Sequence, residues 1–338
     1  MRITAVPFER SRHLEDAAWL LSERHRRDRS RDPRLPAVFE APEPCRALIE
    51  RALAAEGAQA VVAESGGKAV GFAVMAPQLV APTHFLAQFF PPRGCAIQHA
   101  AHAAAEGAEY DAYREMYAAL AERFVERGFF DHAVNISAGD RAAHDALVSL
   151  GFGRGAVTAM RGVEPVARAS ANGVELHQAA AEDEAIVFEL NDELMLHHAR
   201  PPIFQPFIRE TVESEHEMQR GLLQQPDDNA HWVAYEDGRA VGMNTFMPPT
   251  FLSPLTLPEK TVYLFQGIVT KGARAAGVGS AILSRGVDWA REKGYEHVAL
   301  HFMSANIPGA AFWQSSGFRP IEYRMQRHID ERIAWANR

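Results

Sequence analysis

Cysteine is scarce in this sequence, where Cys45 and Cys95 are the only two and lie in unrelated contexts. Two cysteines without C-x-x-C spacing make neither a disulfide framework nor a cysteine-rich zinc site. No apolar run approaches the ~18 residues that a membrane-spanning helix needs, and the first residues lack the apolar core of a signal peptide. We therefore expect a cytoplasmic protein with no membrane partner and no bound metal.

An excess of basic charge is also missing, because the formal net charge is −8. A basic cluster at residues 24–34 is interrupted by acids and a proline, and we interpret it as a solvated helix end and loop. Nucleic acid is thus not an expected partner, since neutralising phosphates supplies much of that affinity. With 47% hydrophobic and 23% charged residues, the 338-residue chain is long enough for two globular domains.

Two stretches of the sequence repeat in the same order. ERGF at 126–129 matches EKGY at 292–295, an offset of 166 residues at which Asp140 faces Asn306. Upstream, ESGGKAVG at 64–71 matches EDGRAVG at 236–242. Two pairs of matching segments, each separated by nearly the same number of residues, indicate a tandem duplication. We predict domains at 1–165 and 172–338, with a small, polar linker at 162–173 that contains Pro and Gly.

The second copy carries clear local signals for strands and helices. Asp237-Gly238 separates runs at 231–236 and 240–247, a strong hairpin signal. Strands that alternate with helices predict an α/β fold built around a mixed sheet. The remaining predicted elements are strands at 174–179, 261–270, 297–303 and 318–326, and helices at 182–197, 280–293 and from Asn306, with Pro308 in its first turn.

The most informative segment is VTKGARAAGVGSAIL at 269–283, in which a strand runs through a glycine-containing loop into a helix. Free backbone N–H groups at a positive helix N-terminus are a common way to bind phosphate. Gly277 and Gly279 remove the β-carbons that would block a close approach, although a glycine inside a helix costs ~1 kcal/mol relative to alanine. The segment therefore predicts a phosphate site.

This loop resembles the acyl-CoA loop of the GNAT superfamily of N-acyltransferases, whose pattern is Q/R-x-x-G-x-G/A. Arg274, Gly277 and Gly279 occupy its three defined places. The resemblance implies two domains that each have a mixed, mostly antiparallel sheet flanked by helices (α+β), with the acyl-CoA site in the second domain. A further family element continues the match at Leu300, Phe302, Asn306, Ala310, Trp313, Gly317 and Phe318.

The resemblance also implies which residues hold the co-substrate, acetyl-CoA or another acyl-CoA. The backbone of Ile268 and Val269 would pair with the pantetheine arm, and Asn306 would approach it. Trp313 stands where many members have a tyrosine that protonates the leaving thiolate, and an indole cannot serve as that acid. It is either a hydrogen-bond donor or a packing residue beside the cofactor. The diphosphate would lie on the N–H groups of Arg274, Ala275, Ala276, Gly277, Val278, Gly279 and Ser280.

The first copy departs from this pattern. At the 166-residue offset, Ala108 replaces the arginine, and Asp111 and Tyr113 replace the two glycines. A carboxylate and a bulky ring then stand where phosphate oxygens would approach. We predict that the domain at 1–165 keeps the fold and has lost the donor site.

Catalytic residues are harder to assign from the sequence. Many GNAT enzymes have a glutamate at the place of His301, whose ordinary pKa near 6.5 suits a base. His301 is either that base or a packed, hydrogen-bonded histidine. Tyr263 stands where some relatives carry a catalytic glutamate, and it either contacts the acceptor or belongs to the core. The adjacent His197 and His198 would point to different sides of a helix, so we do not expect a metal pair.

The function that these residues favour is transfer of an acetyl group from acetyl-CoA to a primary amine of a small molecule or a peptide. In such folds the acceptor contacts segments equivalent to 191–207 and 247–258. Two alternatives remain: a non-catalytic acyl-CoA sensor, and a transferase that uses aminoacyl-tRNA. The complete loop at 274–279 and the negative net charge count against the last.

Overall fold

The computed structural model describes residues 2–167, 171, 173–250 and 252–336. The first half contains β1 (Thr4–Pro7), α1 (Arg10–Arg31), α2 (Pro42–Leu53), β2 (Gln59–Ser65), β3 (Lys68–Leu79), β4 (Arg93–Ile97), β5 (His102–Ala104), α3 (Glu109–Glu126), β6 (Asp131–Ser137), α4 (Arg141–Ser149) and β7 (Gly153–Gly162). The second half contains β8 (Val174–Gln178), α5 (Glu184–His198), α6 (Val212–Leu223), β9 (Ala230–Glu236), β10 (Arg239–Met247), β11 (Thr261–Val269), α7 (Val278–Glu292), β12 (His297–Met303), α8 (Ile307–Ser315), β13 (Arg319–His328) and α9 (Ile333–Ala336).

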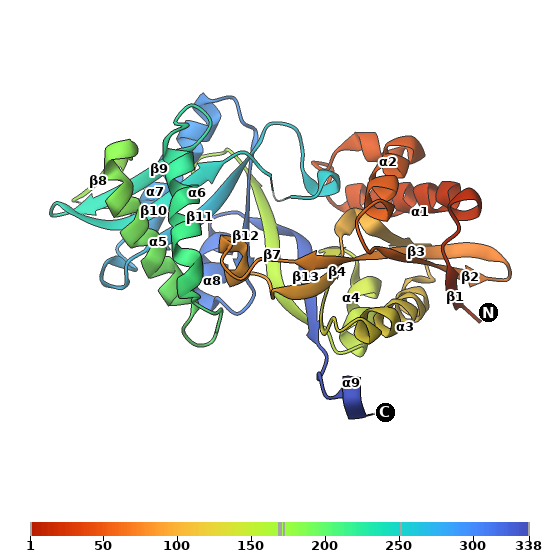
Figure 1. The fold of residues 1–338 in the computed structure, drawn as a ribbon. Helices are drawn as coiled ribbons and strands as arrows, with labels where there is room; N and C mark the ends of the chain where they lie inside the picture. The colour runs from red at the N-terminus through yellow and green to blue at the C-terminus, as the bar shows by residue number, and fades with distance from the viewer. Residues whose placement is uncertain (1, 168–170, 172, 251, 337–338) are drawn as a thin grey trace.

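One sheet runs through the whole described chain, and the last strands of the two halves are exchanged (Figure 1). Its order is β1-β2-β3-β4-β6-β13-β7-β12-β11-β10-β9-β8, with β5 paired to β3. β7 therefore pairs with β12 of the second half, and β13 pairs with β6 of the first half. The two exchanged strands also pair with each other. Each half thus completes its sheet with a strand from the other.

Helices cover both faces of this sheet (Figure 1). In the second half α5 and α6 pack on one face, and α7 packs against β9, β10 and β11 on the other. In the first half α1 and α2 lie on one side and α3 and α4 on the other. The predicted α/β fold with a mixed, mostly antiparallel sheet is confirmed. None of the helices in the described residues is long and apolar enough to cross a membrane.

The two halves use matching residues in matching places. Asp140 accepts a hydrogen bond from Ala143 N at 3.0 Å and caps α4, and Asn306 accepts one from Gly309 N at 3.1 Å and caps α8. Gly151 and Gly317 both have positive φ, at 85° and 92°. Only a residue without a β-carbon adopts this conformation freely, so both helices end in the same way.

The predicted linker at 162–173 lies between the end of β7 and the start of β8, although residues 168–170 and 172 are outside the described residues. The predicted division at 1–165 and 172–338 separates two consecutive segments of the sequence. The strand exchange means that neither of these segments contains all the strands of its own sheet.

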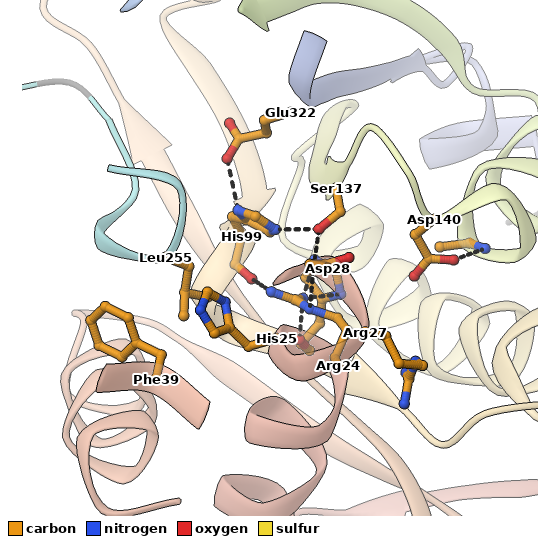
Figure 2. A network of polar contacts seen from close by, with 12 residues as sticks. Arg24, His25, Arg27, Asp28, Phe39, His99, Ser137, Asp140, Leu255 and Glu322 are labelled. Carbon is orange, nitrogen blue, oxygen red and sulfur yellow. Dashed lines mark hydrogen bonds and ion pairs between the residues drawn. The ribbon is translucent and has the colours of Figure 1, made fainter. Parts of the chain in front are cut away.

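A buried polar network ties the first half to β13 (Figure 2). Arg24 of α1 donates to the carbonyl oxygens of His102 at 2.6 Å and His99 at 2.8 Å. The ring of His99 lies 3.0 Å from the hydroxyl of Ser137 and 2.9 Å from the carboxylate of Glu322 on β13. These contacts join four parts of the molecule, which are α1, the segment that follows β4, strand β6 and the exchanged strand β13.

Arg24 should accordingly be important for stability. It is 1% exposed, and its guanidinium lies 3.7 Å from the carboxylate of Asp28, which also accepts a hydrogen bond from Ser137. Arg24→Met leaves that carboxylate with only Arg31, which is 3.6 Å away and 51% exposed, and it leaves the buried carbonyl oxygens of His99 and His102 without this donor. The free energy of unfolding should therefore fall by about 3–5 kcal/mol. Urea unfolding followed by circular dichroism measures this change.

Arg26 provides the matched control, because its side chain is 45% exposed on the same helix. Arg26→Met should change the free energy of unfolding by less than about 0.5 kcal/mol. Equal effects of the two substitutions would show that the network around Arg24 contributes no special stability.

Candidate active site

A cavity of about 490 Å³ lies at the N-terminus of α7, and we call it the large cavity. Its wall includes the end of β11, the loop into α7 and the first turns of α8. Ala276 is not part of the wall, and the side chain of Val278 is buried in the core of the second half. The predicted cofactor residues that do line the cavity are Ile268, Val269, Arg274, Ala275, Gly277, Gly279, Ser280, Asn306 and Trp313.

The loop before α7 has an unusual backbone. Ala275 has φ 67°, although a residue with a β-carbon seldom adopts a left-handed conformation. Gly277, the N-cap of α7, has φ 86° and adopts it without strain. The first N–H groups of a helix have no partner inside the helix, and no side chain of the described residues caps this end. The loop therefore presents free amides and the positive end of the helix dipole to the cavity.

Arg274 adds a positive charge to this end of the cavity. Its Nε donates to the carbonyl oxygen of Val269 at 3.0 Å, which anchors the side chain to the end of β11. The rest of the guanidinium lies in the cavity wall. A cation beside free amides is a site for an anion such as a diphosphate.

Next to the large cavity, the two parallel strands β11 and β12 part. Their pairing runs from Thr261 and His297 to Leu264 and Leu300, and a register shift in β11 follows. A β-bulge of this kind bends a strand away from its neighbour. Gly267 lies just beyond it, and an added β-carbon there would come within 2.9 Å of the ring of Trp313. Glycine at this place lets the indole lie directly on the strand.

A small pocket of about 60 Å³ lies on the other side of the gap. It shares Leu194, Gly267, Asn306 and Trp313 with the large cavity, so the two spaces adjoin where the strands part. His301 of β12 lines the small pocket. The cavity with the free amides of the loop and the pocket with the histidine thus adjoin at the gap between β11 and β12.

His301 contacts Tyr263, the other predicted catalytic residue. The hydroxyl of Tyr263 is hydrogen-bonded to Nδ1 of His301, and the two rings stack with centroids 5.8 Å apart. Burial lowers the pKa of His301 to about 4 and raises the pKa of Tyr263 well above its usual value. At neutral pH both side chains are therefore uncharged. Tyr263 is 1% exposed and lines neither space, so the structure places it behind His301.

The structure adds residues that the sequence did not single out. Phe89, from the first half, lines the small pocket and lies edge-on to His301 with ring centroids 6.5 Å apart. His198 also lines it, and burial lowers the pKa of His198 to about 4. Phe89 belongs to the stretch FLAQFF at 85–90, but the sequence gives no sign of where that stretch packs.

Gln266, also in the wall of the small pocket, leads into a buried polar network behind it. Its side chain donates to Asn191 Oδ1 at 2.5 Å and accepts from Gln219 Nε2 at 2.6 Å. Glu215 lies nearby on α6 and accepts a hydrogen bond from Gln88 of the first half. Burial raises the pKa of Glu215 to about 7. The network fixes the wall of the pocket and joins it to the first half.

The two predicted acceptor segments differ in their positions. The segment 191–207 supplies Leu194, Met195, His198 and Gln205 to the small pocket. Of the described residues of 247–258, none lines either space, and Leu255 packs in the core of the first half. Residue 251 lies outside the described residues. Among those described, no group of three or more His, Cys, Asp or Glu side chains is placed to hold a metal ion.

In the first half, side chains bridge the place that corresponds to the gap. The ring of His102 lies 2.7 Å from the carbonyl oxygen of Asn135 and 2.8 Å from the hydroxyl of Tyr113. Tyr113, the counterpart of Gly279, is 4% exposed. Asp111 is on the surface of α3, with its side chain 69% exposed, so its charge does not enter this space. The ring of Tyr113, and not the carboxylate of Asp111, therefore blocks this place in the first half.

Comparison with known proteins shows similarity to one protein family. Residues 193–318 match the model described as the acetyltransferase (GNAT) family. Over 88 residues, 26% of this chain, the sequence is 32% identical to human N-acetyltransferase 8 and 30% identical to human N-acetyltransferase 8B. The aligned part spans 37% of the length of each human relative.

Solved structures extend the similarity to both halves. A GCN5-related N-acetyltransferase from Sphaerobacter thermophilus aligns over 96% of this chain and 95% of its own, with a TM-score of 0.58 and 14% identity. A glucosamine N-acetyltransferase region of a fungal multi-domain β-N-acetylglucosaminidase aligns over 96% of this chain and 38% of its own, with a TM-score of 0.54 and 13% identity. Residues 193–318 thus match the GNAT acetyltransferase family, and the fold of the whole chain is similar to that of the solved GNAT structures.

Proposed function

We propose that this protein transfers an acetyl group from acetyl-CoA to a primary amine of a small molecule or a peptide. The observation that carries this proposal is the junction of two spaces at the gap between β11 and β12. An anion-binding loop opens on one side of the gap, and an uncharged histidine lines the other.

The residues of the large cavity fit coenzyme A. The free amides at 277–280 and Arg274 would hold the diphosphate, and the open edge of β11 at Ile268 and Val269 would face the pantetheine arm. Trp313 and Asn306 line both spaces, at the place where a thioester would emerge. Bound acetyl-CoA supplies a thioester carbonyl to an attacking amine, with the thiolate as leaving group.

The small pocket favours the reactive form of the amine. A primary amine with a pKa near 10.4 needs about 4.6 kcal/mol to lose its proton at pH 7. The burial that lowers the pKa of His301 to about 4 disfavours any cation in the same pocket. An amine that enters is therefore shifted toward its neutral, nucleophilic state.

We assign the proton acceptor to His301 because Tyr263 can fix its tautomer. When Nδ1–H donates to the oxygen of Tyr263, the lone pair of Nε2 is available to the attacking amine. Tyr263 thus positions His301 and does not contact the substrate. The raised pKa of Tyr263 keeps its hydroxyl neutral at neutral pH.

A thiol-release assay tests the proposal. The full chain with acetyl-CoA should release free coenzyme A when aminoglycosides, polyamines, amino acids or peptides are supplied, and mass spectrometry should show a gain of one acetyl group on the amine. An acyl-CoA sensor would bind acetyl-CoA without thiol release for any amine, and that result would refute the enzymatic proposal.

A further inference from the structure

A third space, of about 420 Å³, lies between the two halves, and we call it the Arg324 cavity. Its wall includes residues of the aromatic stretch before β4, Pro206 and Ile208 from the segment between α5 and α6, and residues of β13. It is formed only because β13 is exchanged into the first half. The function proposed above does not use it.

Phe89 is common to the walls of the Arg324 cavity and the small pocket. On one side its ring lies beside His301, with centroids 6.5 Å apart. The next residue, Phe90, lies under the guanidinium of Arg324, whose Cζ is 4.9 Å from the ring centroid. Phe89 therefore lies beside the histidine, and the residue that follows it in the sequence lies beside the arginine.

The volumes of the small pocket and the Arg324 cavity indicate that different parts of an acceptor would lie in different spaces. One water needs about 10–15 Å³ of such space, so the small pocket of about 60 Å³ accommodates an amine and a short piece of chain. The body of the acceptor must lie outside it. The Arg324 cavity, whose wall shares Phe89 with the small pocket, has seven times that volume, since 420/60 is 7.

Arg324 supplies a positive charge to the wall of this cavity. The guanidinium of Arg324 donates only to neutral amide oxygens among its described partners, Gln78 Oε1 at 2.8 Å and Asn135 Oδ1 at 3.3 Å. Its Nε is buried and has no hydrogen-bond partner among the described residues. The guanidinium of Arg327 lies elsewhere, over the ring of Tyr117 on α3, with Cζ 5.8 Å from the ring centroid. An arginine with unused N–H groups next to a space is suited to a carboxylate or a phosphate.

Other titratable groups also line this cavity or lie close to Arg324. Asp131 lines the cavity, but its carboxylate lies 3.0 Å from the ring of His328, which also lines it. His132 lines the wall too, and burial lowers its pKa, so it is neutral. Glu322 lies on the same strand as Arg324, and burial raises the pKa of Glu322 to about 7, so its negative charge is incomplete at neutral pH.

We propose that the acceptor amine carries an anionic group, and that Arg324 binds this group while the amine lies beside His301. The proposal rests on the proposed acetyl transfer and names the class of its substrate. An anionic group held in this way orients the amine and accounts for a large cavity next to a small pocket.

Matched pairs of amines test this proposal. One arm compares ω-amino acids of increasing chain length with their amides, and the other compares aminoalkyl phosphates with the corresponding amino alcohols. In at least one arm, kcat/KM for the anionic member should exceed that for the neutral member at least about tenfold, as a charge-assisted hydrogen bond allows. Preference in the first arm identifies a carboxylate, and preference in the second identifies a phosphate.

Arginine variants assign the preference to this cavity. Arg324→Gln should reduce it about tenfold, through KM for the anionic amine, and Arg324→Lys, which keeps a cation at this place, should retain most of it. Turnover of the neutral amine and affinity for acetyl-CoA should not change. Arg154→Gln is the control, because Arg154 also lies over an aromatic ring, 3.8 Å from the centroid of Tyr323, and lines none of the three spaces.

Two outcomes would overturn the proposal, and they are distinguishable. If wild type acetylates neutral and anionic members equally well, the anion site is wrong and the acetyl transfer stands. If no amine causes thiol release, the proposed function fails, and the substrate class fails with it.

Discussion

Gly279→Tyr is expected to abolish binding of acetyl-CoA. Gly279 is in the first turn of α7, and a β-carbon added there would meet the ring of Phe312 at 3.3 Å and Val269 at 3.4 Å. The phenol ring of a tyrosine is much larger than a β-carbon, and it would fill the space in front of the free amides. Loss of two charge-assisted hydrogen bonds to the diphosphate raises Kd more than about a hundredfold. Isothermal titration calorimetry with acetyl-CoA measures the change.

The protein itself contains this substitution in its first half. Tyr113 occupies the place of Gly279 there, is buried, and its hydroxyl contacts His102. This supports our prediction that the first half has lost its donor site. Gly153→Tyr is the control, since a β-carbon at Gly153 meets nothing within 4 Å. The control should bind as wild type does; wild-type affinity in Gly279→Tyr would remove the loop from the binding site.

The second large effect is expected from His301→Gln. If Nε2 of His301 accepts the proton of the attacking amine, kcat should fall about a hundredfold or more, which is the usual contribution of a general base. Kd for acetyl-CoA should stay the same, because the side chain lines only the small pocket. Steady-state kinetics and calorimetry on one preparation separate these two effects.

His231→Gln is the matched control for His301→Gln. His231 is also a buried histidine whose pKa burial lowers to about 4, and its ring contacts Thr245 at 3.0 Å away from all three spaces. Both variants should lose comparable stability, and only His301→Gln should lose kcat. If His301→Gln changes stability alone, His301 is the packed histidine of the alternative interpretation.

The pH profile gives a further check on the same residue. Burial lowers the pKa of His301 below its unfolded value of 6.5, so its active, neutral form is present above pH about 4 and is lost as pH falls through that value. Between pH 6 and 9, kcat/KM should therefore rise only with deprotonation of the amine. A step near pH 6.5 that is absent in His301→Gln would show that the ring is exposed to water.

Local signals in the sequence located most of the second half correctly. The strand predicted at 297–303 is β12, and the helix predicted from Asn306 is α8, because asparagine caps and proline fits the first turn. The turn at Asp237-Gly238 has positive φ at both residues, as its composition predicts. These features depend on neighbouring residues only.

The exchange of β7 and β13 could not be predicted in the same way. Both strands follow a Gly-Phe pair at the end of a short helix, and duplication has given both halves similar edges. Either strand therefore satisfies the local pattern in either sheet, and the choice of partner depends on contacts of the whole chain. The same applies to Phe89, whose position beside His301 follows from how the halves pack.

The most direct measurement is a crystal structure of the full chain with coenzyme A. We expect the diphosphate oxygens within hydrogen-bonding distance of the main-chain N–H groups at 277–280, with the pantetheine arm directed into the gap between β11 and β12. Clear density for the nucleotide at any other place, with these amides bound to water, would contradict the account.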